Sequence, residues 1–446
     1  MMNVHNITLF LGAALLPLSV SASEYISEIS PRTAVNLDSE QGRQELSEIL
    51  YSQKLRGITE PVVLEYSAQY DVSNLQIHLP VVGQVGRVLG QIPIVGGLFH
   101  RIFGEFDPPK TLKLRALLFP ALDPRGYLLG VHGLQSNARW YASSGQALAE
   151  RGVTSLFYDR RGSGISDSVL DGNGRPMRGH VASTSLDHLI GLPFNQAVGD
   201  PSEFLEDIQV TYEHLYLVRS LQQSNAPIHL YANCFGARIA LAYAGEWRRP
   251  EEGIASIIMT SPGTNMKKGE PNIGGRLGAV APIEAYQRIP LEDVDFTSNP
   301  EALAEMGDDS HSLTLRKVTN RFLLSAAGLT KKMKSVFKNQ KLAQVPALVF
   351  IPSKDKIIKT EETQQTFAEN YPGPTLVTLL DTEHLIEFDD QARADFVEIV
   401  SQWIYNQNSG WAGYKGAANF ASHLKVQAEE GKLPSLLSEK TKAYRP

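Results

Sequence analysis

One stretch in the middle of the chain, residues 228–242, limits the folds that this protein can adopt. It runs IHLYANCFGARIALA: a short apolar run follows Pro227, a sharp turn falls at Asn233 and Cys234, and helix-forming residues come next. The pattern predicts a buried strand, a tight turn and a helix in direct succession. The side chain at that turn, Cys234, is therefore a candidate nucleophile.

The cysteine at this turn is the only one among 446 residues. In an exported protein, a single cysteine indicates a reactive thiol or a bridge to another molecule rather than a structural disulfide. Its neighbours at the turn, Ala232 and Gly236, are small, as a strained strand-to-helix turn requires. A reactive Cys234 is a better interpretation at this position than an inert buried thiol.

The N-terminal residues 1–22 are typical of a secretory signal peptide. An apolar run over 7–20 is followed by Ser21 and Ala22, small residues that suit a signal peptidase. The run is short for a transmembrane helix. We therefore expect cleavage near Ala22 and a periplasmic or secreted protein. An uncleaved anchor is the alternative, since no Lys or Arg precedes the apolar run.

Strands and helices alternate through the core, which we place at 111–261 and 345–407. This alternation predicts an α/β fold with a mostly parallel sheet and helices on both faces. Strands are predicted over 112–118, 127–131, 154–158, 228–233, 254–260, 345–351 and 375–380, and helices over 140–151, 201–223 and 391–405.

Three regions lie outside this alternation. We expect an N-terminal extension over 23–110, with a helix near 47–55, a cap or lid inserted at 262–344, and a C-terminal tail over 408–446. The stretch 79–104 is rich in Gly, Val, Leu and Ile, and its only charged residues are two arginines. It predicts either an arm packed on the core or peripheral membrane contact.

The predicted elbow supplies part of a site for acyl chemistry. The helix that starts near Phe235 points its amino end at Cys234, and the partial positive charge there favours a thiolate. The N–H of Phe235 is left free to bind an oxyanion. A second donor, the N–H of Leu134, is expected from the loop after an early strand. His132 in that loop is predicted to brace it rather than to react.

The remaining members of a triad follow the last two predicted strands. His384, after the strand at 375–380, is the candidate base, and Asp355, after the strand at 345–351, is the candidate orienting acid. His384 would take the thiol proton of Cys234, and Asp355 would hold the ring and stabilise its cation. Asp381 and Glu383 are alternative acids.

These motifs, in this order, resemble the α/β-hydrolase superfamily, closest to its branch of monoacylglycerol lipases and lysophospholipases. The resemblance covers roughly 112–405 and rests on His132-Gly133-Leu134, on the run DRRGSG at 159–164, on the elbow, and on Asp355 and His384. It implies the fold and an acyl-bearing small-molecule or lipid substrate. The sequence order nucleophile, acid, base is also the one this fold uses.

The elbow departs from that branch, which carries Ser in a G-x-S-x-G pattern. This chain has ANCFG at 232–236. Cys at this position resembles dienelactone hydrolases, polyhydroxyalkanoate synthases and bile-acid acyltransferases, two of which pass acyl groups to acceptors other than water. An acyl group on cysteine is a thioester, which amines and alcohols also attack.

We therefore expect an exported enzyme with a Cys-His-Asp triad that cleaves an acyl ester, thioester or lactone, most of all a lipid-like one. An acyltransferase with the same triad and a non-catalytic ligand-binding member of the fold are the alternatives. The net charge of −6 and the pI near 6.0 argue against a nucleic-acid partner. We expect no cofactor and no metal, because no phosphate loop or metal-ligand cluster stands out.

Overall fold

A computed structural model describes residues 34–69, 111–170, 176–178, 201–246, 253–268, 286–307, 314–339, 342–408 and 414–444. The expected signal peptide, 1–22, and the apolar stretch 79–104 both lie outside these residues. Within the described part of the chain, no helix combines the length and the apolar character needed to cross a membrane.

A single ten-stranded sheet organises the described residues, in the order β1-β2-β3-β5-β4-β8-β9-β12-β13-β14. The strands from β5 to β13 in this order run parallel, whereas β3 and β14 pair antiparallel with β5 and β13. The strands are β1 (Val35–Asn36), β2 (Val62–Gln69), β3 (Thr111–Phe119), β4 (Gly126–Val131), β5 (Val153–Asp159), β8 (Ile228–Asn233), β9 (Ile254–Thr260), β12 (Ala347–Pro352), β13 (Thr375–Leu380) and β14 (Leu436–Tyr444).

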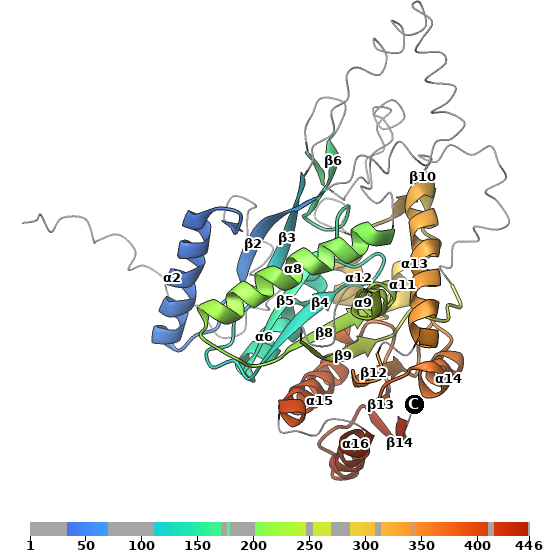
Figure 1. Ribbon diagram of the computed structural model, residues 1–446. Coiled ribbons are helices and arrows are strands. Elements are labelled where there is room, and N and C mark those ends of the chain that lie inside the picture. The colour runs from blue at the N-terminus through green and yellow to red at the C-terminus, as the bar shows by residue number, and fades with distance from the viewer. Residues whose placement is uncertain are drawn as a thin grey trace, which may run out of the picture.

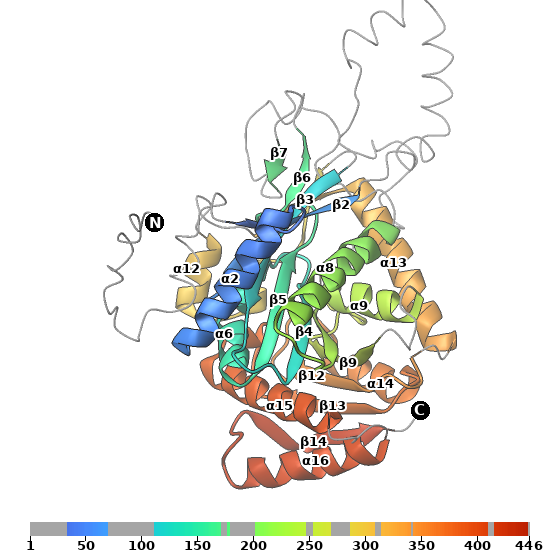
Figure 2. The same ribbon diagram turned by 60° about the vertical axis from the view of Figure 1, so that its left-hand side comes forward.

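Helices cover both faces of this sheet (Figures 1 and 2). Right-handed crossovers place α6 on one face and α8, α9 and α14 on the other, because β4 connects to β5 in the opposite direction from the later connections. The longer helices are α2 (Glu40–Arg56), α6 (Ala142–Glu150), α8 (Pro201–Leu221), α9 (Phe235–Glu246), α13 (Asn320–Asn339), α14 (Thr360–Asn370), α15 (Asp390–Asn408) and α16 (Tyr414–Glu429).

The central strands are buried along their whole length. Every residue of β4, β5, β8, β12 and β13 is buried. Parallel strands covered by helices on both faces show such continuous apolar runs. This arrangement confirms the α/β fold class predicted from the sequence.

Several predicted elements match the structure closely. The strands predicted at 254–260 and 375–380 coincide with β9 and β13. The helix predicted over 140–151 differs, because a 3₁₀ turn, η2 (Ala138–Tyr141), comes first and α6 starts only at Ala142. The side chain of Asn137 accepts the Arg139 N–H at 3.1 Å and so starts the tighter turn.

The sheet extends beyond the region of predicted alternation at both ends. β2, from the expected N-terminal extension, pairs with β3 over its full length, and β14, from the expected tail, pairs with β13. Figure 2 shows α2 near one end of the sheet and α16 with β14 at the other. The helix expected at 47–55 is the second half of α2, which Ser39 caps by accepting the Gly42 N–H at 3.0 Å.

The expected insertion at 262–344 contains helices and a short hairpin in its described part. These are β10 (Tyr286–Arg288), α11 (Asp293–Phe296), α12 (Pro300–Gly307), β11 (Lys317–Thr319) and α13. α13 packs against α9, the helix that follows the elbow. Between α12 and α13, the Leu315 N–H donates to the Gln135 carbonyl at 3.1 Å. The insertion is therefore tied to the loop after β4.

Candidate active site

Cys234 occupies a strained turn between β8 and α9. Its φ of 47° lies in the left-handed region, which costs a non-glycine residue roughly 1–2 kcal/mol. Two hydrogen bonds hold the turn: the Cys234 N–H donates to Thr260 O at 3.1 Å, and the Gly263 N–H donates to Cys234 O at 2.9 Å. The residue is 3% exposed. The predicted strand, turn and helix are all present.

Two positions near the nucleophile require glycine, because another segment of the chain approaches each of them closely. A Cβ at Gly236 would lie 2.2 Å from the carbonyl oxygen of Val131, so only glycine lets α9 approach the end of β4. A Cβ at Gly133 would lie 3.2 Å from Cβ of Cys234 and 2.7 Å from Oδ1 of Asn233. The loop predicted to complete the oxyanion site therefore lies directly against the elbow.

His384 and Asp355 are brought together from separate loops. Nδ1 of His384 hydrogen-bonds Oδ2 of Asp355 at 2.8 Å, and both side chains are buried. The other oxygen of Asp355 accepts the N–H groups of Ile357 at 2.7 Å and Ile358 at 2.9 Å. These bonds fix the carboxylate, so Asp355 can orient the ring as an acid of a triad does.

The two alternative acids are engaged elsewhere. Asp381 accepts hydrogen bonds from Ser353 at 3.0 Å and Lys354 at 3.1 Å, and about half of its side chain is exposed. Glu383 forms an ion pair with Lys356 at 3.0 Å. The geometry therefore favours Asp355 as the partner of His384.

The second ring nitrogen of His384, Nε2, faces the nucleophile without a well-formed hydrogen bond. It is buried and unpartnered among the described residues. Burial alone would lower the pKa of His384, but the charges of Asp355 and Cys234 and the hydrogen bond to Asp355 raise it to about 10. The charge of Cys234 therefore acts on the ring, although no hydrogen bond joins the two side chains. Catalytic hydrogen bonds are often long or poorly aligned before substrate binds.

The side chain of Arg160 holds the loop after β4 in place by hydrogen bonds to two of its carbonyl groups. Its Nη2 donates to Gly133 O at 2.8 Å and to Leu134 O at 3.1 Å. In the trans peptide that joins Gly133 to Leu134, the N–H points in the opposite direction from the C=O. Because that carbonyl, Gly133 O, faces Arg160, the Leu134 N–H points away from Arg160. Neither Leu134 nor Phe235 donates its N–H to another described residue. Both groups are therefore available as oxyanion donors.

The ring of His132 supports the loop after β4 and forms no hydrogen bond with Cys234. Its Nε2 accepts the main-chain N–H of Arg160 at 3.1 Å, which leaves the proton on Nδ1 to bond Gly133 O at 2.8 Å. Burial and the charge of Arg160 hold the pKa of His132 well below its usual range. The ring is therefore neutral and supports the loop.

Two aromatic clusters flank the elbow, and sequence analysis singled out neither. One contains Phe235, the residue after Cys234, and its ring centroids lie 5.6 to 5.7 Å apart. The other contacts His384 through Phe296 at 5.5 Å. Residues this far apart in the sequence carry no shared pattern. The members are Phe204, Phe235 and Phe322 in one cluster, and Trp140, Phe296 and Phe388 in the other.

A buried carboxyl group close to His384 was also missed. Glu387 accepts the Tyr231 hydroxyl at 2.7 Å, and Tyr231 also bonds Thr260 at 2.9 Å. Burial raises the pKa of Glu387 to about 7. In the sequence, Glu387 is one more acid in a polar loop, and nothing local marks it as buried.

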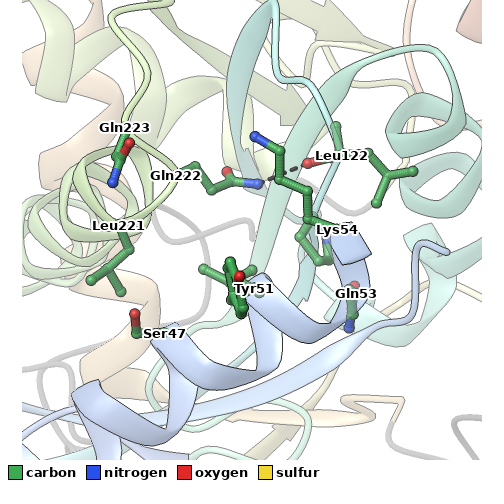
Figure 3. A pocket seen from close by; sticks show the side chains of 11 residues that line it. Ser47, Tyr51, Gln53, Lys54, Leu122, Leu221, Gln222 and Gln223 are labelled. Carbon is green, nitrogen blue, oxygen red and sulfur yellow. Dashed lines mark hydrogen bonds between the residues drawn. The ribbon is translucent and has the colours of Figure 1, made fainter. Parts of the chain in front are cut away.

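A separate hollow of about 320 Å³ lies at the opposite end of the strands from the elbow (Figure 3). Its walls come from α2, including Tyr51 and Lys54, and from the end of α8, where Gln222 donates to Ala121 O at 2.8 Å. This position is near the start of β4, whereas Cys234 follows the end of β8. No member of the predicted triad lines the hollow.

No group of three or more His, Cys, Asp or Glu side chains within the described ranges is arranged to hold a metal ion. The polar groups around Cys234 are instead donors and acceptors suited to acyl chemistry: a thiol, an oriented imidazole and two free N–H groups. This set can attack a carbonyl carbon and stabilise the resulting oxyanion.

Comparison with protein families identifies one model, described as serine aminopeptidase, S33, which matches residues 122–391. The match begins before β4 and ends at the start of α15. It therefore includes the elbow, the expected cap and the loops of Asp355 and His384.

Two known proteins are similar to this chain at low identity. An uncharacterized abhydrolase domain-containing protein of Dictyostelium discoideum is 24% identical over 302 residues, a match that spans 66% of this chain but only 28% of that protein. A soluble variant of monoglyceride lipase from Saccharomyces cerevisiae, solved with a substrate analog, shares 16% identity and a TM-score of 0.50 over 66% of this chain and 92% of the lipase. The likeness to the lipase shows the fold.

Proposed function

Because this chain belongs to the family described as serine aminopeptidase, S33, and has the α/β-hydrolase fold, we propose that it is a hydrolase with Cys234 as nucleophile, His384 as base and Asp355 as orienting acid. The observation that carries the proposal is the buried His384–Asp355 pair at 2.8 Å, with the free ring nitrogen toward the strained elbow. Cysteine stands where the family description implies serine, so the acyl-enzyme is a thioester.

The reaction follows from these positions. Nε2 of His384 takes the thiol proton before the attack and holds it as an imidazolium, Sγ then attacks the acyl carbon as a thiolate, and the N–H groups of Leu134 and Phe235 receive the oxyanion. The carbon–oxygen or carbon–sulfur bond of the substrate then breaks, and the leaving group takes the proton from His384. Water, deprotonated by His384, attacks the thioester and releases the acid and the free thiol.

The proposed substrate is an acyl ester, thioester or lactone, most of all a lipid-like one. The aromatic clusters beside Phe235 and His384 support an apolar acyl group. A monoglyceride lipase is among the structural neighbours, which is consistent with that class. Export through residues 1–22 is part of the same proposal and would place the enzyme among extracellular or periplasmic lipids.

Steady-state hydrolysis tests the proposal. The wild-type chain should hydrolyse p-nitrophenyl butyrate or octanoate, and Cys234→Ala should lose at least about 10³-fold in kcat/KM. Ser422→Ala, at an exposed position on α16, is the matched control and should keep full activity. An aminoacyl p-nitroanilide belongs in the panel because the family is described as an aminopeptidase. Cys234→Ala activity equal to wild type would refute the role of Cys234.

Acyl transfer is the second candidate, and the cysteine favours it. A thioester reacts readily with amines, and Cys234 is 3% exposed, which limits the access of water. Adding hydroxylamine to the ester assay should divert product from free acid to hydroxamate without slowing release of the first product. Formation of free acid alone, at every acceptor concentration, would support the hydrolase.

A further inference from the structure

Arg160 is a fully buried cation without a carboxylate partner among the described residues. The two acids close enough to act on its charge are committed to other groups. Asp159 accepts the N–H groups of Ala138 at 2.7 Å and Ile165 at 2.8 Å. Asp207 accepts two bonds from the guanidinium of Arg161, at 2.9 and 2.6 Å.

The guanidinium of Arg160 uses only part of its donor set. Nη2 bonds the carbonyls of Gly133 and Leu134, and the charge lies 5.4 Å from the ring centroid of Phe235. Nε and Nη1 are buried and make no hydrogen bond. Arg160 therefore contacts both residues that are proposed to supply the oxyanion donors, and it presents unused N–H groups beside them.

A neighbouring side chain shows the same lack of partners. Gln135, which follows Leu134, is 1% exposed, yet neither its amide oxygen nor its amide nitrogen makes a hydrogen bond. Buried polar groups are normally paired, and an arginine cannot relieve burial by losing its proton. Unpaired groups from two separate segments at one loop indicate a ligand that completes them.

We propose that Arg160 binds a carboxylate of the substrate beside Cys234, so that the preferred acyl compounds are anionic, such as half-esters of dicarboxylic acids. The inference rests on the proposed function, in that it takes Cys234 as the attacking group. A carboxylate fits better than a phosphate, because its single charge matches the single unpaired cation.

Alkylation of Cys234 tests the proposed carboxylate site directly, because the chain has no other thiol. Iodoacetate and iodoacetamide react identically: Sγ bonds carbon and iodide leaves. No oxyanion forms, so a change in loop position alone does not alter their relative rates. In Arg160→Gln, the rate ratio of iodoacetate to iodoacetamide should fall by about tenfold or more, since a charge-assisted hydrogen bond is lost. The iodoacetamide rate should stay within about threefold.

Two further variants separate specific binding from charge and from misfolding. Arg151→Gln removes an exposed arginine far from the elbow and should leave the ratio unchanged. Arg160→Lys keeps the charge and should retain part of the preference for iodoacetate. An unchanged ratio in Arg160→Gln would overturn the proposal and leave Arg160 as a brace of the loop.

A wild-type measurement covers the case in which Arg160→Gln fails to fold. Monomethyl succinate and methyl butyrate offer acyl chains of equal length that differ by one carboxylate. Methanol release should be about tenfold faster in kcat/KM from the succinate half-ester. Equal or slower release would overturn the anion site. Absence of Cys234 labelling by both reagents, together with no release from either ester, would instead refute the proposed function itself.

Discussion

The buried pair of His384 and Asp355 sets the protonation of the site. The pKa of His384 rises from 6.5 to about 10, against the effect of burial, because the charges of Asp355 and Cys234 favour the cation. A raised pKa means that the pair stabilises the fold fully below pH 6.5 and that this contribution is lost as the pH rises toward 10. The imidazolium is therefore present through neutral pH.

Asp355→Asn removes the charge that maintains this state. The pKa of His384 should fall, and the alkaline limb of the pH profile of kcat/KM should move to lower pH by more than about one unit. The rate at neutral pH should drop on the order of 10²- to 10⁴-fold. Asp381→Asn changes a half-exposed acid that does not touch His384, so its profile should match that of the wild type. A wild-type profile in Asp355→Asn would contradict the assignment.

The residues of the triad could be proposed from the sequence because each follows a strongly predicted strand. The sequence already favoured Asp355, but Asp381 stayed an alternative because both acids follow strand ends, and in the structure only Asp355 contacts His384. The roles of Arg160 and Glu387 could not be predicted from the sequence for another reason. Their importance comes from being buried without full partners, and burial of a charged residue in a polar loop has no local pattern.

The strand–turn–helix element positions Cys234 by close backbone approach. α9 starts against the end of β4, and the contact leaves no space for a side chain at Gly236. Predictions were most accurate for such elements, whose apolar runs are continuous. β14 was missed because most of its residues are exposed or half-buried and several are charged, including Glu439, Lys440 and Lys442, as is typical of an edge strand, so the apolar signal is weak.

Gly236→Ala should destabilise the protein by about 1–3 kcal/mol, because the new methyl group would clash with the Val131 carbonyl. Urea unfolding monitored by circular dichroism measures the change. Gly307→Ala, at the end of α12, meets nothing within 4 Å and should change stability by less than about 0.5 kcal/mol. Equal stability of the two variants would show that α9 does not approach β4 as described.

At the scale of the whole molecule, the sheet joins both ends of the described chain to the catalytic core. β14 covers the edge of β13, the strand that leads to His384, and Ser435 before β14 donates to Asp395 of α15 at 2.8 and 2.6 Å. The sequence predicted the centre of this sheet and not its edges. Long-range pairing depends on contacts between distant segments, which local periodicity does not encode.

Export is also a property of the whole chain. If residues 1–22 act as a signal peptide, expression in a bacterium with a periplasm should yield a protein in that compartment whose mass begins at Ser23. Intact mass spectrometry of fractionated cells measures this. A protein of full-length mass in the membrane fraction would indicate an anchor, and one in the cytosol would refute export.

The central claim, that Cys234 carries the acyl group, is tested most directly by mass. After brief exposure to p-nitrophenyl octanoate and acid quenching, the intact wild-type protein should gain the mass of one octanoyl group, which hydroxylamine removes. Fragmentation should place the group on Cys234. Cys234→Ala should gain no mass. An octanoyl adduct of equal yield in Cys234→Ala would contradict the account.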